Sequence, residues 1–380
     1  MTKRIDRIDL PQMSPGTDRY LKVHRYGTLG ARPKAYIQAS LHADEIPGMM
    51  AAHHLLRRLD EADKRNEITG EIIVVPVANP IGLGQFVNRT HVGRYELRSG
   101  GNFNRRWPDL FDGLVAATAG KLGNDAAGNV TVIRQAIGIA LDKMSASGEF
   151  PALRLALSKL AYDADIVLDL HCDDDAEVHL FLIPENWPDG RDLAALIGAK
   201  AVLLASDSGG ASFDETFSAP WVKLQEAVGP GVPVPAACLS GTVEFRGQHD
   251  VFDEIGIPDA DALFAFLQHR GLVGGKAAAV PAPACDATML DACDVVRAPA
   301  AGVLAYKVSL GQKVQAGDVI AEIIDPLADD QSLARTQVRC QTDGHVLSRK
   351  LMKLVVTGES ISKVVGTMSL AYRQGLLLED

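Results

Sequence analysis

The stretch that decides the fold is AYIQASLHADEIPGMMAAHHLLRRL, residues 35–59, in which a short apolar segment leads directly into an amphipathic one. The apolar segment predicts a buried strand, and Pro47 suits the first turn of the helix that follows it. His42 and Glu45 stand at the junction, three residues apart. The last side chains of such a strand face the crevice above an α/β sheet, where ligands bind. A His-x-x-Glu pair therefore suits a metal site here, although it also fits a polar loop that caps a helix.

The composition is that of an ordinary globular protein. The chain has 380 residues, of which 47% are hydrophobic and 23% charged, enough for one large α/β domain and a smaller one. The formal net charge of -10, without a basic stripe, argues against a nucleic-acid partner. No apolar run reaches membrane-spanning length and the first residues lack a secretory signal, so we expect a cytoplasmic protein without a membrane partner. The five scattered cysteines favour reduced thiols over disulfides or a thiolate zinc site.

Strand-like and helix-like segments alternate through the first 273 residues. This alternation predicts an α/β fold with a mixed, mainly parallel sheet and flanking helices. Residues 20–40 favour a hairpin, and residues 81–110 and 206–218 favour loops, of which the longer is expected to be functional. Beside the opening stretch, strands are expected at 71–78, 165–171, 179–184, 201–205 and 238–245, and helices at 130–144, 151–163, 191–200 and 260–270.

The composition changes after residue 273, which suggests a domain boundary. Residues 274–288 are rich in alanine, proline and glycine, as in a linker. Residues 289–380 contain two halves with a similar glycine pattern, which predicts a small all-β barrel-sandwich domain. This segment resembles the biotinyl/lipoyl carriers. The hairpin between its halves, DPLADDQS, has no lysine, so we expect no attached biotin or lipoyl group.

A third candidate ligand stands at the end of another predicted strand. His171 closes the run DIVLDLH, and the ends of parallel strands lie on one side of a sheet. A catalytic zinc ion usually has three protein ligands, of which two histidines and a glutamate are one known set. His171 alone would equally suit a hydrogen-bonded histidine. Together with His42 and Glu45 it predicts a metal site.

The segment GRYELRSGGNFNRRWP, residues 93–108, combines arginines, asparagines and aromatic residues. It is either a solvated basic loop or part of a binding site. A guanidinium group suits a carboxylate or a developing oxyanion, because it donates two parallel hydrogen bonds.

Taken together, these motifs resemble the succinylglutamate desuccinylase/aspartoacylase family, a branch of the zinc carboxypeptidase superfamily. The resemblance rests on His42-x-x-Glu45, His171, the pair Asn104-Arg105 in NFNRRWP, and Glu244 in GTVEFRG. It covers nearly the whole chain, because members often carry a C-terminal β domain. It implies a zinc carboxypeptidase-like catalytic domain over residues 1–273, a linker over 274–288 and a β domain over 289–380.

The resemblance also implies a role for each ligand candidate and for Glu244. His42, Glu45 and His171 are expected to bind one Zn²⁺ per chain. Glu244 is expected to take a proton from the attacking water and to deliver it to the leaving amine. Without this context, a glutamate on a strand would be expected to face solvent.

The arginine-rich segment is expected to bind the substrate. Arg94 resembles the arginine that stabilises the tetrahedral oxyanion, and Arg98 is an alternative for that role. Asn104 and Arg105 resemble the clamp for the free carboxylate of the substrate.

We therefore expect a zinc-dependent amidohydrolase that cleaves the amide bond of a small N-acyl amino acid. The alternatives are a metallocarboxypeptidase acting on peptides and a catalytically silent binding protein on the same scaffold. The acidic stretches 172–177 and 212–215 are either solvated loop charges or a site for a cationic substrate. The acyl group, the amine and the formation of a homo-oligomer stay open.

Overall fold

The first part of the chain is built on a nine-stranded sheet, and the computed structural model describes residues 1–378. Strands in the middle of the sheet are parallel, and antiparallel pairings occur towards both sides. In spatial order the strands are β1 (Arg4–Asp9), β2 (Tyr20–Tyr26), β4 (Glu71–Val75), β3 (Lys34–Ala39), β7 (Ile166–Asp173), β11 (Leu239–Gly247), β9 (His179–Leu182), β10 (Ala201–Leu204) and β12 (Ala287–Met289). The predicted mixed, mainly parallel sheet is confirmed.

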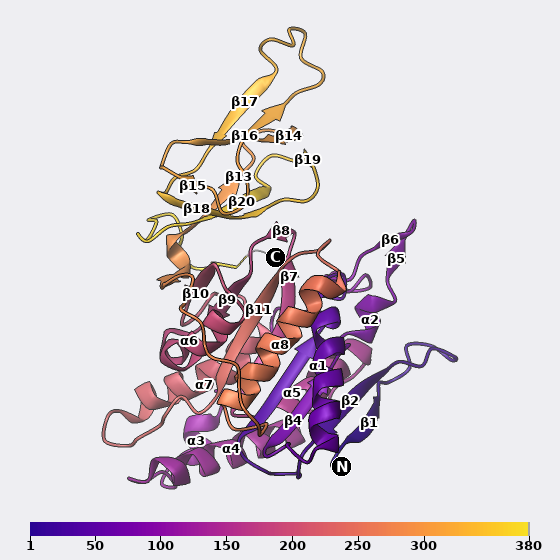
Figure 1. Cartoon of the computed structure of the whole chain (residues 1–380), viewed down its shortest axis with the longest axis vertical. Helices are drawn as coiled ribbons and strands as arrows, with labels where there is room; N and C mark the ends of the chain where they lie inside the picture. The colour runs from indigo at the N-terminus through magenta and orange to yellow at the C-terminus, as the bar shows by residue number, and fades with distance from the viewer. Residues whose placement is uncertain (379–380) are drawn as a thin grey trace.

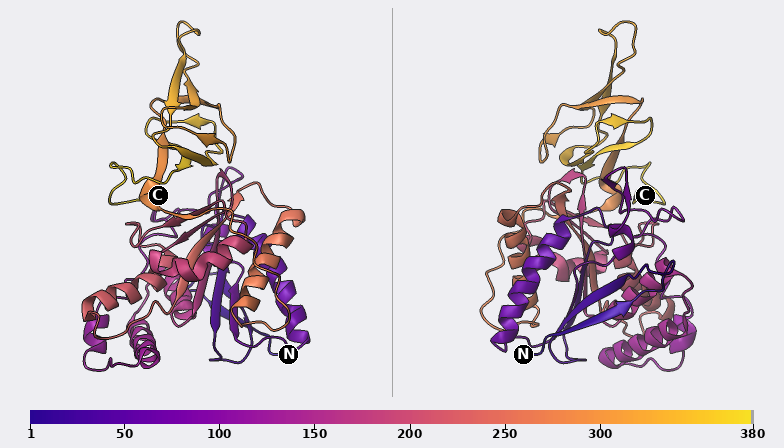
Figure 2. Two further views of the ribbon diagram at one scale, coloured as in Figure 1. Left: turned by 60° about the vertical axis from the view of Figure 1, so that its left-hand side comes forward. Right: turned by 90° about the vertical axis from the view of Figure 1, so that its right-hand side faces the viewer.

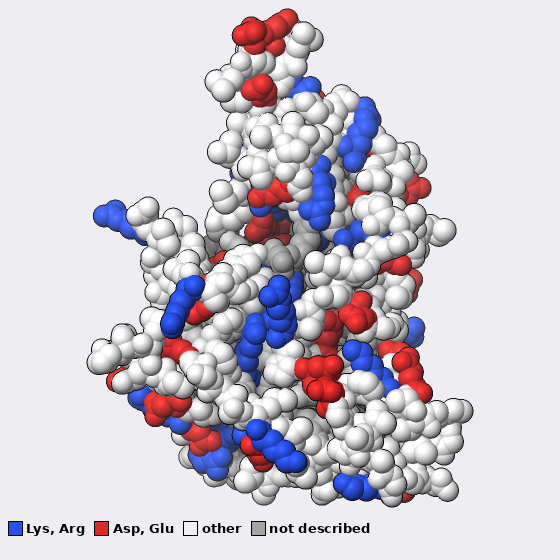
Figure 3. Space-filling view, turned by 180° about the vertical axis from the view of Figure 1, so that it is seen from behind, with Lys and Arg blue, Asp and Glu red and all other residues white. Residues whose placement is uncertain are grey.

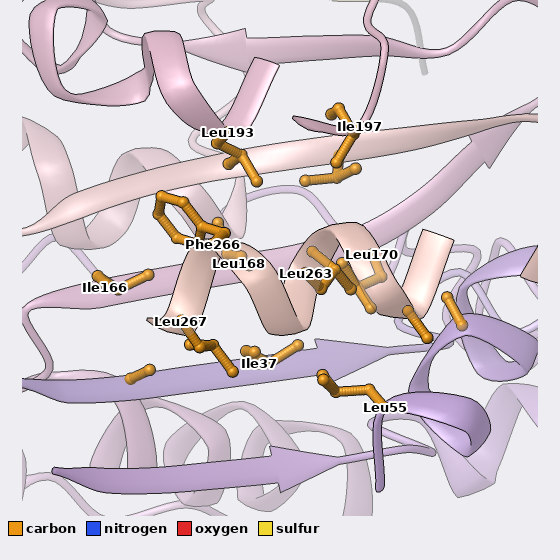
Figure 4. Packing of buried hydrophobic residues seen from close by; sticks show 14 of the residues in the cluster. Ile37, Leu55, Ile166, Leu168, Leu170, Leu193, Ile197, Leu263, Phe266 and Leu267 are labelled. Carbon is orange, nitrogen blue, oxygen red and sulfur yellow. The ribbon is translucent and has the colours of Figure 1, made fainter. Parts of the chain in front are cut away.

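Helices cover both faces of this sheet (Figures 1 and 2). One face is covered by α1 (Pro47–Lys64), α6 (Trp187–Leu196) and α8 (Asp253–His269). The other is covered by α3 (Leu114–Thr118), α4 (Ala126–Lys143), α5 (Glu149–Ala161) and α7 (Phe213–Val228). Figure 4 shows the first interface, where Leu55 of α1 and Leu263 and Phe266 of α8 pack over Ile37 and Leu168 of the sheet. Apolar burial of this extent is the main stabilising contribution to such a layered fold.

The opening stretch of the sequence folds as predicted. All six residues of β3 are buried, and Pro47 begins α1. The helix starts close to the neighbouring strand β7, because a Cβ atom on Gly48 would lie 2.5 Å from the carbonyl oxygen of Leu170. This contact fixes the loop that carries His42 and Glu45 above the ends of β3 and β7.

Two sequence predictions are wrong. Residues 20–40 do not form a hairpin, because β4 lies between β2 and β3. The expected loop over 206–218 ends at Ser212, where α7 begins with a capping box formed by Ser212 and Glu215. The Ser-x-x-Glu spacing is a known signal for a helix start and would have predicted this boundary. The loop over 81–110 also contains short elements, which are α2 (Pro80–Leu83), β5 (Phe86–Val87) and β6 (Thr90–His91).

The C-terminal part consists mainly of short strands in two sheets. One sheet contains β13 (Cys293–Arg297), β20 (Ser360–Val365), β18 (Gly344–Arg349) and β15 (Lys313–Val314), and the other contains β17 (Arg335–Arg339), β16 (Val319–Ile324), β14 (Gly302–Tyr306) and β19 (Leu354–Val355). Buried side chains of both sheets form one apolar cluster. The barrel-sandwich assignment and the domain boundaries stay predictions. Strand β12, within and just after the expected linker, pairs with β10 of the large sheet.

The two parts meet at the end of the large sheet where β7 terminates (Figure 1). Strand β8 (Asp175–Ala176) follows β7 and pairs with β18 of the C-terminal part. Among residues 1–378, no helix has the length and apolar character needed to cross a membrane. On the face seen in Figure 3, basic and acidic side chains are interspersed and form no stripe of one sign.

Candidate metal centre and its pocket

His42, Glu45 and His171 meet above the ends of β3 and β7. All three are buried, and each offers one ligand atom within 4.8 Å of the others. His42 Nδ1 lies 2.9 Å from Glu45 Oε1, and His171 Nδ1 lies 2.7 Å from Glu45 Oε2. Because β3 and β7 are adjacent and parallel, their carboxyl ends bring these residues together. The sequence prediction that the three residues form one cluster is confirmed.

The outer nitrogen of each imidazole ring faces a polar side chain. His42 Nε2 lies 2.9 Å from Asn102 Oδ1, and His171 Nε2 lies 2.8 Å from Asp169 Oδ2. If each Nε2 carries the proton, each Nδ1 presents a lone pair towards the same point beside Glu45. Two imidazole nitrogens and a carboxylate oxygen form a donor set that fits zinc.

Burial and neighbouring charges shift the pKa of all three candidate ligands. Burial lowers the pKa of His42 to about 4, assisted by the positive charge of Arg94. Burial acts to lower the pKa of His171 as well, but the carboxylates of Asp169 and Glu45 raise it well above its ordinary value. Burial acts to raise the pKa of Glu45, yet the two histidines hold it well below the usual range. Glu45 therefore keeps its negative charge between the two rings, as a carboxylate ligand of a metal does.

Asp169 and Asn102 are site residues that the sequence reasoning missed. Asp169 is fully buried, and its other oxygen accepts a hydrogen bond of 3.0 Å from Gln38 Nε2. A signal for Asp169 exists in the sequence, because residues two apart on a strand point to the same face and DLH places a carboxylate two residues before His171. Asn102 lies in a loop, and no periodicity marks it.

A pocket with about 980 Å³ of empty space, part of it open solvent, lies above the cluster. All seven candidate residues that the sequence suggested, besides Arg98, line it. These are His42, Glu45, Arg94, Asn104, Arg105, His171 and Glu244. Arg98 is exposed outside this pocket, so the structure separates the two arginines between which the sequence left a choice.

Arg94 lies directly against the candidate ligands. Its Nη1 is 3.1 Å from Glu45 Oε1 and 3.2 Å from His42 Nδ1. Burial acts to lower its pKa, but the charge of Glu45 and the weaker effects of Tyr95, Asp44 and Glu244 together raise it. The guanidinium group is thus charged and adjacent to two of the candidate metal ligands.

Asn104 and Arg105 are positioned by the start of α7 and the loop before it. The backbone amide of Phe213 donates to Asn104 Oδ1 over 2.8 Å, and Arg105 Nη1 donates to the carbonyl oxygen of Asn104 over 2.8 Å. A Cβ atom on Gly210 would lie 3.0 Å from Cδ of Arg105, so a side chain at this position would crowd Arg105. The loop and helix therefore hold both side chains in the pocket.

Glu244 stands on β11, opposite His171 on the adjacent strand β7. The register of the two strands shifts directly after Glu244, as at a β-bulge, which commonly re-aims side chains near sites. Burial and the charge of Glu45 raise the pKa of Glu244 to about 8. Among residues 1–378, no hydrogen-bond partner is found for its Oε2, which leaves this oxygen available to a ligand.

The acidic stretch 172–177 largely serves to dock the C-terminal part. Asp173 Oδ2 lies 2.5 Å from Lys363 Nζ, and Asp175 Oδ2 accepts from Arg349 Nη2 over 2.8 Å. Burial would raise the pKa of Asp173, but the ammonium group of Lys363 holds it at about 2. Of this stretch, only Cys172 and Asp173 line the pocket. This arrangement weakens the interpretation of the stretch as a site for a cationic substrate.

The second acidic stretch does reach the pocket. Glu215 accepts hydrogen bonds from the backbone amides of Ser208 and Ser212, over 2.7 Å and 3.2 Å. Asp214 accepts one of 2.6 Å from the Ser212 hydroxyl, and burial raises its pKa to about 6. Asp214 is therefore the acid of this stretch that a cationic group of a ligand would stabilise in its charged form.

The fold and the site define an α/β protein with a candidate metal centre of two histidines and one glutamate at the carboxyl edge of its parallel strands. The chain is similar to the succinylglutamate desuccinylase/aspartoacylase family. Its residues 31–130 match the family model described as the succinylglutamate desuccinylase/aspartoacylase catalytic domain. This segment contains His42, Glu45 and the arginine-rich loop.

Relatives match over most of the chain. The N-alpha-acetyl-L-2,4-diaminobutyric acid deacetylase of Halomonas elongata is 26% identical over 346 residues, which span 88% of this chain and 82% of that protein. The crystal structure of a succinylglutamate desuccinylase/aspartoacylase family protein from Shewanella amazonensis has a TM-score of 0.80 at 24% identity, covering 95% of this chain and 98% of that one. The product-bound ectoine utilization protein EutE (DoeB) of Ruegeria pomeroyi has a TM-score of 0.68 at 16% identity, covering 97% and 96%. These two structures share the fold of this chain.

Proposed function

We propose that the chain is a zinc-dependent amidohydrolase that removes the acyl group from a small N-acyl amino acid. The observation that carries this proposal is the meeting of a His-Glu-His donor set, Glu244 and Arg94 in one pocket. The deacetylase of Halomonas elongata, a relative over most of the chain, supports the same class of reaction.

His42, Glu45 and His171 would hold one zinc ion through their Nδ1 and carboxylate atoms. When bound, zinc supplies a Lewis acid that polarises the amide carbonyl and makes water acidic enough to react near neutral pH. Asp169 and Asn102 keep the two imidazole rings in the orientation and tautomer that this binding needs.

Glu244 transfers a proton from the attacking water to the leaving amine. Its free oxygen accepts a proton from the attacking water as the new carbon–oxygen bond forms at the amide carbon. The same group then delivers this proton to the amide nitrogen, the carbon–nitrogen bond breaks, and an amine and a carboxylic acid leave. The high pKa of Glu244 in its partly apolar surroundings suits a group that must both accept and donate a proton near pH 7.

Arg94 and Arg105 supply positive charge for the oxyanion and for the substrate carboxylate. Arg94, which lies 3.1 Å from Glu45 Oε1, can donate to the oxyanion that develops on the former carbonyl oxygen. Arg105 and Asn104 hold the free carboxylate of the amino acid. Positioning of this kind lowers the barrier because the reacting groups are already oriented in the bound state.

The structure favours a small substrate over a peptide. Residues of the C-terminal part, including Leu290, Val295, Lys363 and Arg373, line the pocket together with the candidate metal ligands. A metallocarboxypeptidase would need room for the peptide that precedes its last residue. The acidic side chain of Asp214 adds one feature in favour of an amine with a cationic side chain, such as 2,4-diaminobutyrate.

The test is a hydrolysis screen with zinc-loaded protein. We expect N-acetyl-2,4-diaminobutyrate, N-acetylornithine or N-acetylleucine to be cleaved, dipeptides to be cleaved poorly, and chelator-treated protein to be inactive. Preferred cleavage of dipeptides would establish the carboxypeptidase alternative. Stoichiometric zinc without turnover of any compound would favour the silent binding protein. Equal rates on acetylornithine and acetylleucine would exclude Asp214 as a cation receptor.

A further inference from the structure

Two cations of the C-terminal part line the pocket, and they differ in their partners. Lys363 on β20 is paired with Asp173, at 2.5 Å. Arg373, eight residues beyond β20, forms no ion pair with a carboxylate of residues 1–378. Within the same residues, the one hydrogen bond found for its side chain runs from Nη2 to the carbonyl oxygen of Leu377, over 2.7 Å. Within residues 1–378, Lys363 is therefore neutralised by a carboxylate, whereas Arg373 is not.

The burial of Arg373 makes the lack of a carboxylate partner among residues 1–378 significant. The residue is only 8% exposed, and its Nε is buried without a hydrogen-bond partner among residues 1–378. Removing a charged group from water is unfavourable unless the charge is paired and its hydrogen bonds are made. A buried and unneutralised guanidinium group on the wall of a ligand pocket therefore suits a position that an anionic ligand completes.

The segment that carries Arg373 is held in place at both ends. Before it, the Ser369 hydroxyl donates to Asp291 Oδ1 over 2.9 Å, and the Tyr372 hydroxyl donates to Asp294. After it, the backbone amide of Leu377 donates to the carbonyl oxygen of Ser208 over 2.8 Å. The guanidinium group thus has a fixed position beside the loop that also contacts Arg105, and such preorganisation favours ligand binding.

We propose that Arg373 is a substrate-binding residue that receives a carboxylate of the substrate. This inference rests on the proposed function, because an N-acyl amino acid brings an α-carboxylate to the pocket. The carboxylate bound by Arg373 is either this group, shared with Arg105, or a second one on the acyl group or on the amino-acid side chain. In each case the C-terminal part binds the substrate in addition to lining the pocket.

Three pairs of compounds separate these sources, because each pair differs by one carboxylate. N-acetylleucine and its amide test the α-carboxylate, N-acetylglutamate and N-acetylglutamine test the side chain, and N-succinylleucine and N-succinamoylleucine test the acyl group. In the zinc-loaded wild-type protein we expect higher kcat/KM for the acid in at least one pair. In Arg373→Met this preference should fall at least about tenfold, the effect expected from one lost charge-assisted hydrogen bond.

The ratio of the two kcat/KM values within a pair is independent of the fraction of active protein. A partly misfolded variant therefore still gives a result. Arg373→Gln keeps a donor for Leu377 and is expected to lose the same preference. Arg339→Met, which removes an exposed arginine from β17, is the matched control and should leave all ratios unchanged. Unchanged ratios for all three pairs in both Arg373 variants would overturn the proposal.

Binding measurements keep this proposal separate from the proposed function. Calorimetric titrations of the Glu244→Gln protein, with and without Arg373→Met, give the affinities for the same six compounds. If the wild type cleaves none of them, the proposed hydrolysis fails, and a carboxylate preference in binding that depends on Arg373 would still support the present inference. Equal binding selectivity with and without the arginine would overturn it.

Discussion

Asp169 and Asn102 face the outer ring nitrogens of the two candidate histidine ligands. Asp169 Oδ2 is 2.8 Å from His171 Nε2, and Asn102 Oδ1 is 2.9 Å from His42 Nε2. Both rings therefore direct Nδ1 towards Glu45. Partners of this kind fix the orientation of metal-binding histidines and raise their basicity.

Asp169→Asn should weaken zinc binding about 10- to 100-fold, because an amide neither stabilises nor orients the His171 ring as a carboxylate does. Competition with a chelator of known affinity measures the effect. Asp142→Asn, which alters an exposed carboxylate on α4, is the control and should bind zinc like the wild type. Unchanged zinc affinity in Asp169→Asn would contradict the role given to this residue.

Removal of the charge should affect kcat very differently at Arg94 and at Arg98. Arg94→Met is expected to lower kcat about 100- to 1000-fold, as the loss of one oxyanion donor does in other enzymes. Arg98→Met should change kcat little, because Arg98 is exposed outside the pocket. Steady-state kinetics on the best substrate compare the two, and a larger loss in Arg98→Met would reverse the assignment.

The sequence allowed the prediction of the residues that end strands. His42, Glu45 and His171 follow or close apolar runs whose parallel ends must lie together, so their meeting could be inferred. Asn102 and the route of the loop that carries it could not, because their positions depend on turns and on contacts with α7 that no periodicity records. Arg373 was also missed, since the docking of the C-terminal part on the pocket is set by side-chain pairs far apart in the sequence.

At the scale of elements, the start of α1 is held against β7 by a glycine. A Cβ atom at Gly48 would lie 2.5 Å from the carbonyl oxygen of Leu170, which is backbone and cannot turn aside. Any side chain here must push α1 away from the strand that carries His171. The loop between β3 and α1 would move with it.

Gly48→Ala should therefore destabilise the protein by about 1–3 kcal/mol, as overpacking of a close contact does, and should also weaken zinc binding. Thermal unfolding and chelator competition give the two results. Gly231→Ala is the matched control, because no heavy atom lies within 4 Å of the position of its Cβ and its backbone is not left-handed. Equal stability of the two variants would contradict the close contact.

The start of α7 and the strand order around β4 differ from the sequence prediction for different physical reasons. The start of α7 was missed although Ser212 and Glu215 form a capping box, since glycines 209 and 210 just before them favoured a loop. The strand order around β4 is a different case. Local sequence favoured a hairpin between β2 and β3, but the buried run of β4 pairs with both of them, and this pairing is a long-range effect.

For the whole molecule, the ion pair between Lys363 and Asp173 joins the two parts at the pocket. Their side chains are 25% and 17% exposed, so both charges are largely removed from water. Removing one partner of such a pair leaves the other charge buried and unpaired. The stability of the assembled chain should depend on this pair in a non-additive way.

Lys363→Met should lower the unfolding temperature more than the double variant Lys363→Met with Asp173→Asn, in which the remaining charge is neutralised as well. Thermal unfolding of the wild type and of both variants at pH 7 tests this order. A double variant that is no more stable than the single one would show that the charge of Asp173 is satisfied without Lys363.

The central claim concerns Glu244 as the proton-transfer group of a zinc-dependent hydrolase. The most direct measurement is the bound zinc content and the turnover of the best N-acyl amino acid for wild type and Glu244→Gln, side by side. We predict equal zinc content and a loss of kcat of about 100- to 10,000-fold in Glu244→Gln, because the amide cannot accept the proton from water. Turnover at the wild-type rate in a zinc-loaded Glu244→Gln protein would contradict the proposed mechanism.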